Sequence, residues 1–586
     1  MKVSSSGRSG SRQSKGTTRL PTPQAKRLPP AVANSFFLVS CLREARRFRR
    51  SVGDVAGTQE KLLLENLWRN AGTEYGRRHG FGNIRSAAEY RERAPLTEYE
   101  DYAGAVERIG AGEEGVLTHD PVLLLEPTSG SSTATKLIPY TAALREEFGR
   151  AVSPWVADLF RDRRLLGGTA YWSASPVARH EERTPGGIPI GFEDDAGYLG
   201  RGRGALLRSV MAVPEEARRI QDIESFRYAT LLFLLRSRSL ALISVWNPTF
   251  LTLLVSRLPE WWPNLASDIA RGIISTSLPS EIESRLAALN KPDPRRADEV
   301  RAAFGAEDPG SVHSRLWPRL RLVSCWTEAH AALHVPEVTR LFPQARIQGK
   351  GLLATECAVS FPLRGLTGSA LAIRSHFFEF LPEDADGDPT LLAHELEPGV
   401  RYSVVVTTGG GLYRYRLHDV VEVSGHLGGC PLFRFLGREG FVSDHFGEKL
   451  DERHVRDALH ALLPRHAPRA AFAMVAFEAG QAPDNGAYAL FIEADGASDA
   501  ALLDLGRDLE ETLLENYHYR YCRDLGQLGA LRVFRARHGL ETYHAVCRER
   551  GQKAGDIKPV ALHRLEGWSR RFAGDFLAPA RTSGAG

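Results

Sequence analysis

Apolar residues recur at helical spacing near the start of the chain. Over residues 31–50, Phe37, Cys41 and Phe48 fall on one side of a helix and arginines on the other, which predicts an amphipathic helix. A second stretch, residues 59–80, also has helical spacing and ends in Arg-Arg-His-Gly. That ending is typical of a helix C-terminus, so one helix is predicted there.

The middle of the chain alternates between strand-like and helical patterns. The run PVLLLEP at residues 121–127 predicts a short buried strand that turns into a Gly/Ser loop, and a helix is predicted from Thr141. Residues 205–345 are mainly helical in pattern, and short strand-like runs punctuated by Gly and Pro follow them. Strands that alternate with helices favour an α/β architecture.

The pattern changes again after LGREGFVSDHFGEKLDE. A helix over residues 452–463, strands in AFAMVAFE and YALFIEAD, a helix around residues 502–517 and a strand in LRVFRA predict a small α+β unit. We therefore expect two domains of α/β and α+β structure. The larger N-terminal one, with mixed sheets and helices, covers residues 31–436, and the smaller α+β one covers residues 437–586.

Charge separates the start of the chain from the rest. The chain has 586 residues and a net charge of +4, but residues 1–30 hold seven Lys or Arg and no acid. The remainder has 68 basic and 71 acidic residues, so we expect no basic groove for nucleic acid. Because the leader is rich in Ser, Gly and Pro and has no apolar run, it is predicted to be disordered and not a secretory signal, with a targeting or binding arm as the alternative.

Two further features bear on the location of the protein. Six cysteines lie far apart with no Cys-x-x-Cys pair, which disfavours disulfide scaffolds and zinc fingers and fits a reducing cytoplasm. Residues 239–256, SLALISVWNPTFLTLLVS, are uncharged and about long enough to span a bilayer. Asn247-Pro248 interrupts them, and a residue before proline is biased away from helix. Two buried elements with a break are therefore predicted, not a membrane span.

Residues 124–141, LLEPTSGSSTATKLIPYT, leave an apolar run for a cluster of hydroxyl residues around one glycine, followed by a single lysine. Backbone N–H groups in a tight turn, hydroxyls and one cation together bind phosphate oxygens well. The Gly-Lys-Ser/Thr ending of a Walker A motif is missing. Taken alone, the segment fits both a solvated surface loop and a phosphate-binding loop.

Together with other segments, this loop resembles the auxin-responsive Gretchen Hagen family of acyl acid-amido synthetases, in its bacterial branch, within the adenylate-forming superfamily. From about residue 60 to 560 the other segments, in family order, are TEYGRRHGF, PLTEYEDY, YWSASP, SVWNP, KGLLATEC, TTGGGLYRYRLHDVV, FLGREGFVSDHFGEK and GQKAGDIKP. The resemblance implies a large adenylation domain and a mobile C-terminal domain that alternates between two orientations. It also implies ATP and Mg²⁺ as cofactors.

The resemblance further implies a ligase. Such an enzyme joins a carboxylic acid to AMP, releases pyrophosphate, and passes the acyl group to an amine or amino acid. The partners expected are a small acid and an amine, with no nucleic acid and no membrane, and the protein is expected to be a cytoplasmic monomer or weak oligomer. A coenzyme A ligase of the same superfamily and a nucleotide-binding protein without catalysis are the alternatives.

The resemblance assigns nucleotide binding to the loop and to three later motifs. The residues expected to bind ATP are Thr128, Ser129, Gly130, Ser131, Ser132, Lys136, Thr355, Glu356, Tyr415, Asp419 and Arg438. The loop would hold the β- and γ-phosphates, Glu356 would bind Mg²⁺, and Asp419 would accept from the ribose hydroxyls. The family often has glycine before this aspartate, whereas this chain has His418.

Catalytic roles follow from the same motifs. Lys558, in GDIKP, would bridge the substrate carboxylate and the α-phosphate, with Lys553 as the competing candidate. Arg438 would lie near the ribose or phosphates, and Lys449 near the α-phosphate or the hinge, although a surface position is equally open for Lys449. His330, in TEAHA, is a candidate base for the amine because histidine titrates in a suitable range.

The acyl pocket is assigned to two motifs, YWSASP and SVWNP. The matching residues are Trp172, Ser173, Trp246, Asn247 and Pro248. Aromatic walls suit an aryl or long apolar acid, and ordinary core packing is the alternative.

Overall fold

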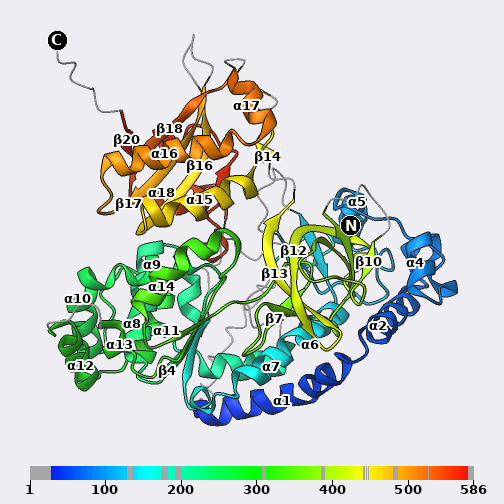
Figure 1. Cartoon of the computed structure of the whole chain (residues 1–586). Coiled ribbons are helices and arrows are strands. Elements are labelled where there is room, and N and C mark those ends of the chain that lie inside the picture. The colour runs from blue at the N-terminus through cyan, green and yellow to red at the C-terminus, as the bar shows by residue number, and fades with distance from the viewer. Residues whose placement is uncertain are drawn as a thin grey trace, which may run out of the picture.

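The computed structural model arranges the chain in three units (Figure 1). The residues that it describes are 28–128, 136–172, 183–191, 200–306, 312–383, 390–439, 442–443, 445–446, 448–479, 486–524, 527–552 and 554–578. The predicted disordered leader falls almost wholly on residues 1–27, outside these ranges.

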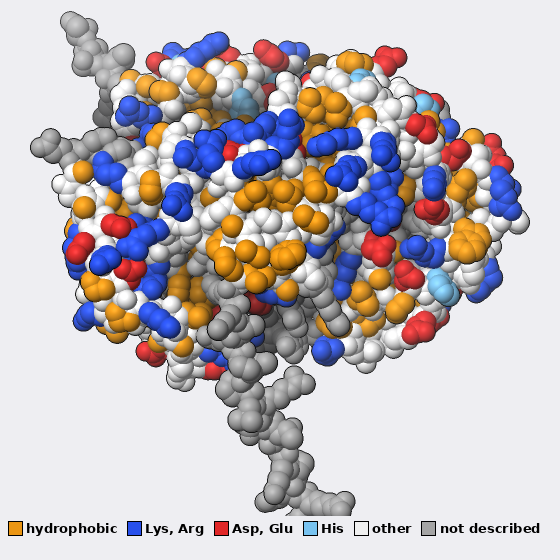
Figure 2. All heavy atoms as spheres, turned by 90° about the horizontal axis from the view of Figure 1, so that it is seen from below, with side chains coloured by type: hydrophobic (Ala, Val, Ile, Leu, Met, Phe, Trp, Pro, Cys, Tyr) orange, Lys and Arg blue, Asp and Glu red, His pale blue; other side chains and the backbone are white. Residues whose placement is uncertain are grey.

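Helix α1 (Pro30–Ser51) confirms the first predicted helix. Its buried Phe37 and Cys41 pack against Val156 and Leu159 of α6 (Ala142–Leu159), because apolar residues three or four apart share one side of a helix. In Figure 1 this helix runs along the bottom of the molecule. The surface seen from below shows Lys and Arg side chains gathered in a band beside hydrophobic ones (Figure 2).

The second predicted helix is two helices, so the prediction of one was wrong. Helix α2 (Val55–Asn70) ends before Thr73, and α3 (Glu74–Arg78) begins after it. The Thr73 hydroxyl accepts a hydrogen bond from the Gly76 N–H at 2.9 Å and so caps α3. The first two N–H groups of α3 donate, at 2.9 and 3.1 Å, to main-chain carbonyls outside the helix. They are therefore not donated to the last carbonyls of α2, and α2 ends before them.

A four-stranded parallel sheet forms one unit, in the order β3 (Thr169–Trp172), β4 (Leu240–Ser244), β5 (Leu322–Ser324) and β6 (Arg346–Gln348). One face packs against α6. The other packs mainly against helices that Figure 1 shows in green. The helices of this region are α7 (Gly200–Val210), α8 (Ile223–Arg236), α9 (Pro248–Val255), α10 (Leu258–Arg271), α11 (Ser280–Leu289), α12 (Pro294–Phe304), α13 (Val312–Leu316) and α14 (Val335–Leu341).

The uncharged run 239–256 forms two buried elements, as predicted. Strand β4 comes first, and α9 begins after the break. The Asn247 side chain caps α9 by accepting from the Thr249 N–H at 2.9 Å, and Pro248 takes the first helical position, where its missing N–H costs nothing. Among the described residues, no helix is long and apolar enough to cross a membrane.

A seven-stranded antiparallel sheet forms the second unit, in the order β10-β9-β11-β12-β13-β8-β7. Its strands are β7 (Ser360–Pro362), β8 (Ser369–Leu371), β9 (Phe377–Pro382), β10 (Leu391–Leu392), β11 (Arg401–Thr407), β12 (Tyr415–Leu427) and β13 (Cys430–Arg438). Its core also receives side chains from α1, α5, α6 and the β1–β2 pair. The remaining elements of this region are α4 (Ala87–Arg93), α5 (Glu100–Gly110), β1 (Leu124–Pro127) and β2 (Leu137–Tyr140).

The C-terminal unit is a five-stranded mixed sheet in the order β19-β16-β17-β18-β20, with helices on both faces. Figure 1 shows it above the other two units. Its elements are β14 (Val442–Ser443), β15 (Leu450–Asp451), α15 (Glu452–His466), β16 (Ala470–Glu478), β17 (Ala487–Ala494), α16 (Asp499–Leu513), α17 (Tyr517–Asp524), β18 (Gly529–Arg537), α18 (Gly539–Glu549), β19 (Leu562–His563) and β20 (Ala573–Phe576). The predicted fold class, α/β with α+β, is confirmed, and the predicted boundary at residues 436–437 falls inside β13.

Candidate active site

The β12–β13 hairpin places an acidic side chain opposite a basic one. Asp419 on β12 is the register partner of Arg438 on β13, so both side chains leave the same face of the sheet. The pairing of β12 with β11 is irregular next to this point, and His418 has a left-handed φ of 61°. A bulge of this kind re-aims the neighbouring side chain. Tyr415, at the start of β12, is buried.

Charged groups from distant parts of the chain meet at Asp419. Burial raises the pKa of Glu356, and the charge of Asp419 raises it further, while Arg438 and Lys136 act in the opposite direction. Burial also raises the pKa of Asp419, against the charges of Arg438 and Lys558. These five residues form one charged cluster. Because burial disfavours the ionised carboxylates, an added cation or hydrogen-bond donor would stabilise them.

Lys558 reaches this cluster from the C-terminal unit. Its Nζ lies 4.3 Å from the centroid of the Trp326 ring, a cation–π distance. The main chain that carries it is held at two points. Tyr543 Oη on α18 donates to the Lys558 carbonyl at 2.8 Å, and Asn247 Nδ2 of the N-terminal part donates to the Ile557 carbonyl at 3.0 Å. The second contact joins the two parts of the chain next to Lys558.

The predicted phosphate loop is described only at its two ends. The Thr128 N–H donates to the Lys136 carbonyl at 2.9 Å, which closes the base of the loop. The Lys136 Nζ lies 3.8 Å from Glu100 Oε1 and 5.2 Å from the centre of the Tyr99 ring. Four residues predicted to bind phosphate lie outside the described residues, namely Ser129, Gly130, Ser131 and Ser132.

The cluster fits a magnesium ion that shares its ligands with phosphate. Glu356 and Asp419 supply carboxylate oxygens, which Mg²⁺ prefers, and this ion usually keeps water and phosphate as its other ligands. Elsewhere in the described chain, and here, no three His, Cys, Asp or Glu side chains form a metal-binding group. Two carboxylates therefore suit an ion that arrives with a nucleotide, and not a site built wholly from protein.

Thr355, next to Glu356, contributes through its main chain. Its carbonyl accepts a hydrogen bond from Tyr140 Oη on β2, the strand that follows the phosphate loop. This contact ties the loop that carries Glu356 to the loop that carries Lys136.

Tryptophans gather beside the cluster. The rings of Trp246 and Trp326 are 5.7 Å apart, and those of Trp155 and Trp172 are 6.1 Å apart. Lys350 connects the two pairs, because its Nζ lies 4.9 Å from the Trp246 ring and 5.8 Å from the Trp155 ring. Trp172 and Trp246 therefore belong to one group of aromatic rings that also includes Trp155 and Trp326, and its role as the wall of an acyl pocket stays a prediction.

Family models match most of the chain. The GH3 family N-terminal domain matches residues 44–347, the central domain matches residues 369–438, and the C-terminal domain matches residues 452–565. The chain belongs to the GH3 family. This is the family predicted from the sequence motifs.

Named GH3 proteins cover much of the same length. The indole-3-acetic acid-amido synthetase GH3.4 of Arabidopsis thaliana is 26% identical, over 68% of this chain and 70% of its own. The probable indole-3-acetic acid-amido synthetase GH3.7 of Oryza sativa subsp. japonica is 27% identical, over 91% and 95%. The solved structure of AtGH3.15 acyl acid amido synthetase in complex with 2,4-DB has a TM-score of 0.79 at 20% identity, over 92% and 97%, so it shares the fold. These proteins do not test the predicted bacterial branch, which stays a prediction.

The other three predicted catalytic residues of this GH3 protein differ in their surroundings, and only Arg438 belongs to the charged cluster. Arg438 is exposed at the end of β13 and faces Asp419. Lys449 is exposed with a φ of 43°, and its carbonyl accepts from Asn516 Nδ2 at 3.2 Å. His330 lies in the 3₁₀ turn Ala329–His334, but its side chain lies outside the described part. The roles of all three stay predictions, and Lys553 and Ser173 also fall outside the described residues.

In this structure Asn247 and Pro248 stabilise the main chain at the start of α9. Asn247 caps α9 and holds the Ile557 carbonyl of the C-terminal unit, as described above. Both residues are buried. Their predicted role as pocket walls stays untested, and the observed role of Asn247 is to fix the chain that carries Lys558.

Sequence reasoning missed Lys350, Trp155 and Trp326. Lys350 stands in the motif KGLLATEC, in which the predicted functional residues are Thr355 and Glu356. One available signal was its position directly after a strand of a parallel sheet, where ligands bind in open α/β folds.

His418 stands between two carboxylates. Its Nε2 lies 2.6 Å from Glu98 Oε2, and its Nδ1 lies 3.2 Å from Glu439 Oε2. The hydrogen bond with Glu439 raises the pKa of His418 above its ordinary value of 6.5, although burial opposes the shift. Because the pKa is raised in the folded state, protonated His418 stabilises the fold below the unfolded pKa, and this stability is lost as pH rises through the folded pKa.

We therefore expect replacement of His418 by glutamine to lower the melting temperature most near pH 6 and progressively less at higher pH. Thermal unfolding of both proteins between about pH 5.5 and 9 measures the difference in melting temperature, since the imidazole of His418 loses its proton in this range. The exposed His394 supplies the control substitution, because it takes no part in the contact of His418 with Glu98 and Glu439. A His418→Gln difference that stays constant with pH would contradict the prediction.

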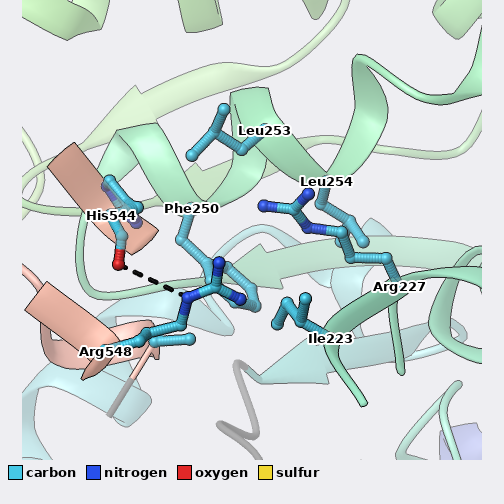
Figure 3. Close-up of a pocket in the computed structure, with 8 residues that line it drawn as sticks. Ile223, Arg227, Phe250, Leu253, Leu254, His544 and Arg548 are labelled. Carbon is cyan, nitrogen blue, oxygen red and sulfur yellow. Dashed lines mark hydrogen bonds between the residues drawn. The ribbon is translucent and has the colours of Figure 1, made fainter. Parts of the chain in front are cut away.

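A separate pocket lies between α8, α9 and α18 (Figure 3). Arg227 and Arg548 face each other across it, and Arg548 Nε donates to the His544 carbonyl at 3.4 Å. Burial lowers the pKa of His544 to about 3, so this imidazole is neutral, and its Nε2 lies 3.1 Å from Thr249 Oγ1. No residue of the charged cluster lines this pocket. It belongs to the contact between the C-terminal unit and the rest of the chain.

Proposed function

We propose that this GH3 protein is an ATP-dependent acyl acid-amido synthetase. It joins a small carboxylic acid to AMP and then transfers the acyl group to an amine or amino acid. One observation carries the proposal: the charge of Lys558, on the C-terminal unit, acts on the carboxylate of Asp419 in the N-terminal part, and Asp419 in turn acts on the neighbouring carboxylate of Glu356. A site divided in this way suits a reaction in which a cation must enter between two anions.

The first step joins an oxygen of the acid to the α-phosphorus of ATP and breaks the bond to the β-phosphate, so that pyrophosphate leaves. Both reactants are anions and repel each other. Lys558, placed between them, lowers this repulsion, and a positioned cation is most effective where water is excluded. Asp419 accepts from the ribose hydroxyls and fixes the nucleotide.

Lys136 and the loop that it ends bind the β- and γ-phosphates. Thr128 holds the loop closed at its base, and Tyr140 ties the Thr355 carbonyl to it. Bound Mg²⁺ would offset phosphate charge, and Glu356 is its protein ligand, with Asp419 close by. These residues act by holding charge in place, which supplies much of the catalysis in phosphoryl chemistry.

The second step forms the amide. The amine nitrogen attacks the acyl carbon, the bond to AMP breaks, and the amine loses a proton. AMP leaves far more readily than oxide would, which is the chemical reason for the first step. The substrates follow from the relatives, whose names give indole-3-acetic acid or acyl acids as the acids that they conjugate. His330 is the proposed base.

Release of pyrophosphate that depends on added acid tests this proposal. A panel of carboxylic acids is screened with ATP, and each active acid is then offered amino acids, with amides detected by mass spectrometry. Trapping the adenylate with hydroxylamine, in parallel reactions with amines and with coenzyme A, separates an amide synthetase from a thioester ligase. ATP binding without acid-dependent pyrophosphate release would instead support a protein without catalysis.

Replacement of Asp419 by asparagine is expected to weaken ATP binding by about 10- to 100-fold, because a hydrogen bond to a charged group contributes roughly 1.5–3 kcal/mol. Calorimetric titration with ATP and Mg²⁺, without acid, measures the affinity. Asp504→Asn is the control, since Asp504 is half exposed and forms a surface ion pair with Arg507. An Asp419→Asn protein with wild-type affinity would remove the ribose role.

The cytoplasmic location, the mobility of the C-terminal domain and the monomeric or weakly oligomeric state belong to the same proposal and stay predictions. Size-exclusion chromatography with light scattering tests the oligomeric state directly.

A further inference from the structure

The pocket between α8, α9 and α18 brings two guanidinium groups together (Figure 3). Arg227 extends into it from α8, in the N-terminal part, and Arg548 extends into it from α18, in the C-terminal unit. No acidic side chain of the described residues lines it, and its other walls are mainly apolar. Two like charges that face each other repel, so a negative charge between them would lower the electrostatic free energy. The apolar lining residues are Ile223, Phe250, Leu253, Leu254 and Ala554.

Arg548 forms no ion pair within the described part of the chain. The two nearest acids, Glu224 and Glu541, pair with other arginines. Glu224 carboxylate oxygens lie 2.9 Å from Arg227 Nη1 and 3.1 Å from Arg257 Nη2, and Glu541 Oε1 lies 3.9 and 3.6 Å from the same two nitrogens. These acids act on the charge of Arg548 only at longer range. The positive charge at the C-terminal side of the pocket therefore lacks a direct partner.

The hydrogen bonds of Arg548 point to the same need. Its Nε donates to the His544 carbonyl at 3.4 Å, but the described residues offer no acceptor to its two Nη groups, which carry most of the N–H donors of a guanidinium. Burial and the charge of Arg227 lower the pKa of Arg548. His544 adds no negative charge, because burial lowers its pKa to about 3 and the imidazole is neutral. An anion would accept these N–H groups and offset the repulsion.

The size of the pocket restricts the anion. Its free volume is about 10 Å³, which is room for one particle of roughly the size of a water molecule. Phosphate, sulfate and the carboxylate of a metabolite are larger, whereas a halide ion such as chloride fits. A halide accepts hydrogen bonds from any direction, so it can receive N–H groups from both arginines at once. A water molecule would fit as well, but it brings no charge to oppose their repulsion.

The helices that line the pocket also hold the main chain of Lys558. Tyr543 of α18 donates to the Lys558 carbonyl at 2.8 Å. Asn247, which caps α9, donates to the carbonyl of the preceding residue at 3.0 Å. An anion bound to both arginines would tie α18 to α8. It would therefore favour the orientation of the C-terminal unit in which the charge of Lys558 acts on Asp419.

We infer that this pocket binds one chloride-sized anion between Arg227 and Arg548, and that the bound anion favours the orientation of the C-terminal unit that forms the acyl-adenylate. The binding site stands on the contacts within the pocket alone. Its effect on the reaction rests on the proposed function, because it assigns adenylation to Lys558. Bromide should replace chloride, whereas gluconate is too large to enter.

Binding is tested without turnover. In crystals of the whole protein soaked in sodium bromide, we expect an anomalous peak between the two guanidinium groups. In solution, chloride that replaces gluconate at constant ionic strength should raise the melting temperature saturably. Arg548→Met keeps the packing of the long stem and should lose this rise. Arg550→Met removes the same charge from an exposed position just after α18, so this control should keep the rise.

The reaction supplies a second readout. Acid-dependent exchange of labelled pyrophosphate into ATP should rise by at least about fivefold as chloride replaces gluconate, the lower end of the usual coupling between two sites. Amide formation from synthetic acyl-adenylate should not rise. Arg548→Met should exchange at the chloride-free rate whatever the chloride concentration. Arg548→Lys should keep part of the response, because lysine keeps the charge but not the planar set of donors.

The outcomes separate this inference from the proposed function. Bromide bound between the two arginines in a protein that releases no pyrophosphate with any acid would sustain the anion site and refute the proposed activity. Exchange that does not depend on chloride would sustain the activity and overturn the inferred effect. Crystals with bromide at other sites but none between the arginines would overturn the inference, as would equal melting responses of the wild type and Arg548→Met. The bromide result needs no variant, so it decides even where Arg548→Met fails to fold.

Discussion

Replacement of Lys558 by alanine is expected to slow acyl-adenylate formation by about 10²–10³-fold, the cost of removing one group that stabilises developing charge. The affinity for ATP should change by less than about twofold, because the lysine acts between the two reacting anions and not in ground-state nucleotide binding. Lys558 is exposed in the structure and contacts the Trp326 ring, so its removal leaves no buried cavity. The fold should therefore be unaffected.

The two half-reactions provide the sharpest measurement. Adenylate formation is followed by acid-dependent exchange of labelled pyrophosphate into ATP, and amide formation is followed from synthetic acyl-adenylate and an amine. Lys558→Ala should impair the first and leave the second intact. Lys291→Ala, at an exposed position, should alter neither. Equal loss in both half-reactions would show that Lys558 supports the structure and not the adenylation step.

The contacts that hold Lys558 in place are individually weak. Glu541 of α18 lies 3.9 Å from Arg227 and 3.6 Å from Arg257, and Asn247 holds the Ile557 carbonyl. Partly exposed ion pairs contribute only about 0–1 kcal/mol each. An interface built from such pairs suits a domain that changes orientation between two steps, which the proposed two-step reaction requires.

Local patterns in the sequence were sufficient for most elements. The Asn247-Pro248 break divided an apolar run into a strand and a helix, because the residue before proline avoids helix and Asn caps the helix that follows. The same reasoning failed between residues 59 and 80, where Thr73 starts a new helix. Its capping signal, a threonine after a glycine, does not stand out because the apolar spacing continues across it.

The row of side chains at the carboxyl ends of the parallel strands, together with Lys350, could not be predicted from the sequence. Its members stand at positions 172, 244, 324, 348 and 350, and only the pairing of four parallel strands brings them together. Register between strands separated by long crossovers is a tertiary property that no local pattern encodes. The motifs located Glu356, Asp419 and Lys558 because each stands in a recognisable segment, whereas the serines of the row stand in ordinary apolar strands.

Replacement of Arg414 by methionine is expected to lower the free energy of unfolding by about 3–5 kcal/mol, the cost of removing one partner of a buried ion pair. The side chains of Arg414 and Glu379 are each 1% exposed, with Nη2 and Oε1 3.1 Å apart. The guanidinium also donates to the carbonyls of Arg91 and Ala94 at 3.0 and 2.8 Å. Without it, the Glu379 carboxylate would remain buried without its charge partner.

This residue connects stability to the active site. Arg414 has a left-handed φ of 49° and directly precedes β12, the strand that begins at Tyr415 and carries Asp419. The Arg414 guanidinium bonds both to the segment around Arg91 and to Glu379 in the sheet. These contacts fix the position at which β12 starts. We therefore expect the Arg414→Met protein that remains folded at low temperature to bind ATP more weakly as well.

Thermal and urea unfolding measure the effect, with Arg434→Met as the matched control. Arg434 pairs with Glu422 at 3.3 Å across β12 and β13, but its side chain is 53% exposed, and an exposed pair contributes at most about 1 kcal/mol. Adding Glu379→Met to Arg414→Met should restore part of the lost stability, because the unpaired buried charge is then gone. If the single variant were as stable as the control, or the double variant less stable than the single one, the buried carboxylate would not be the origin of the loss.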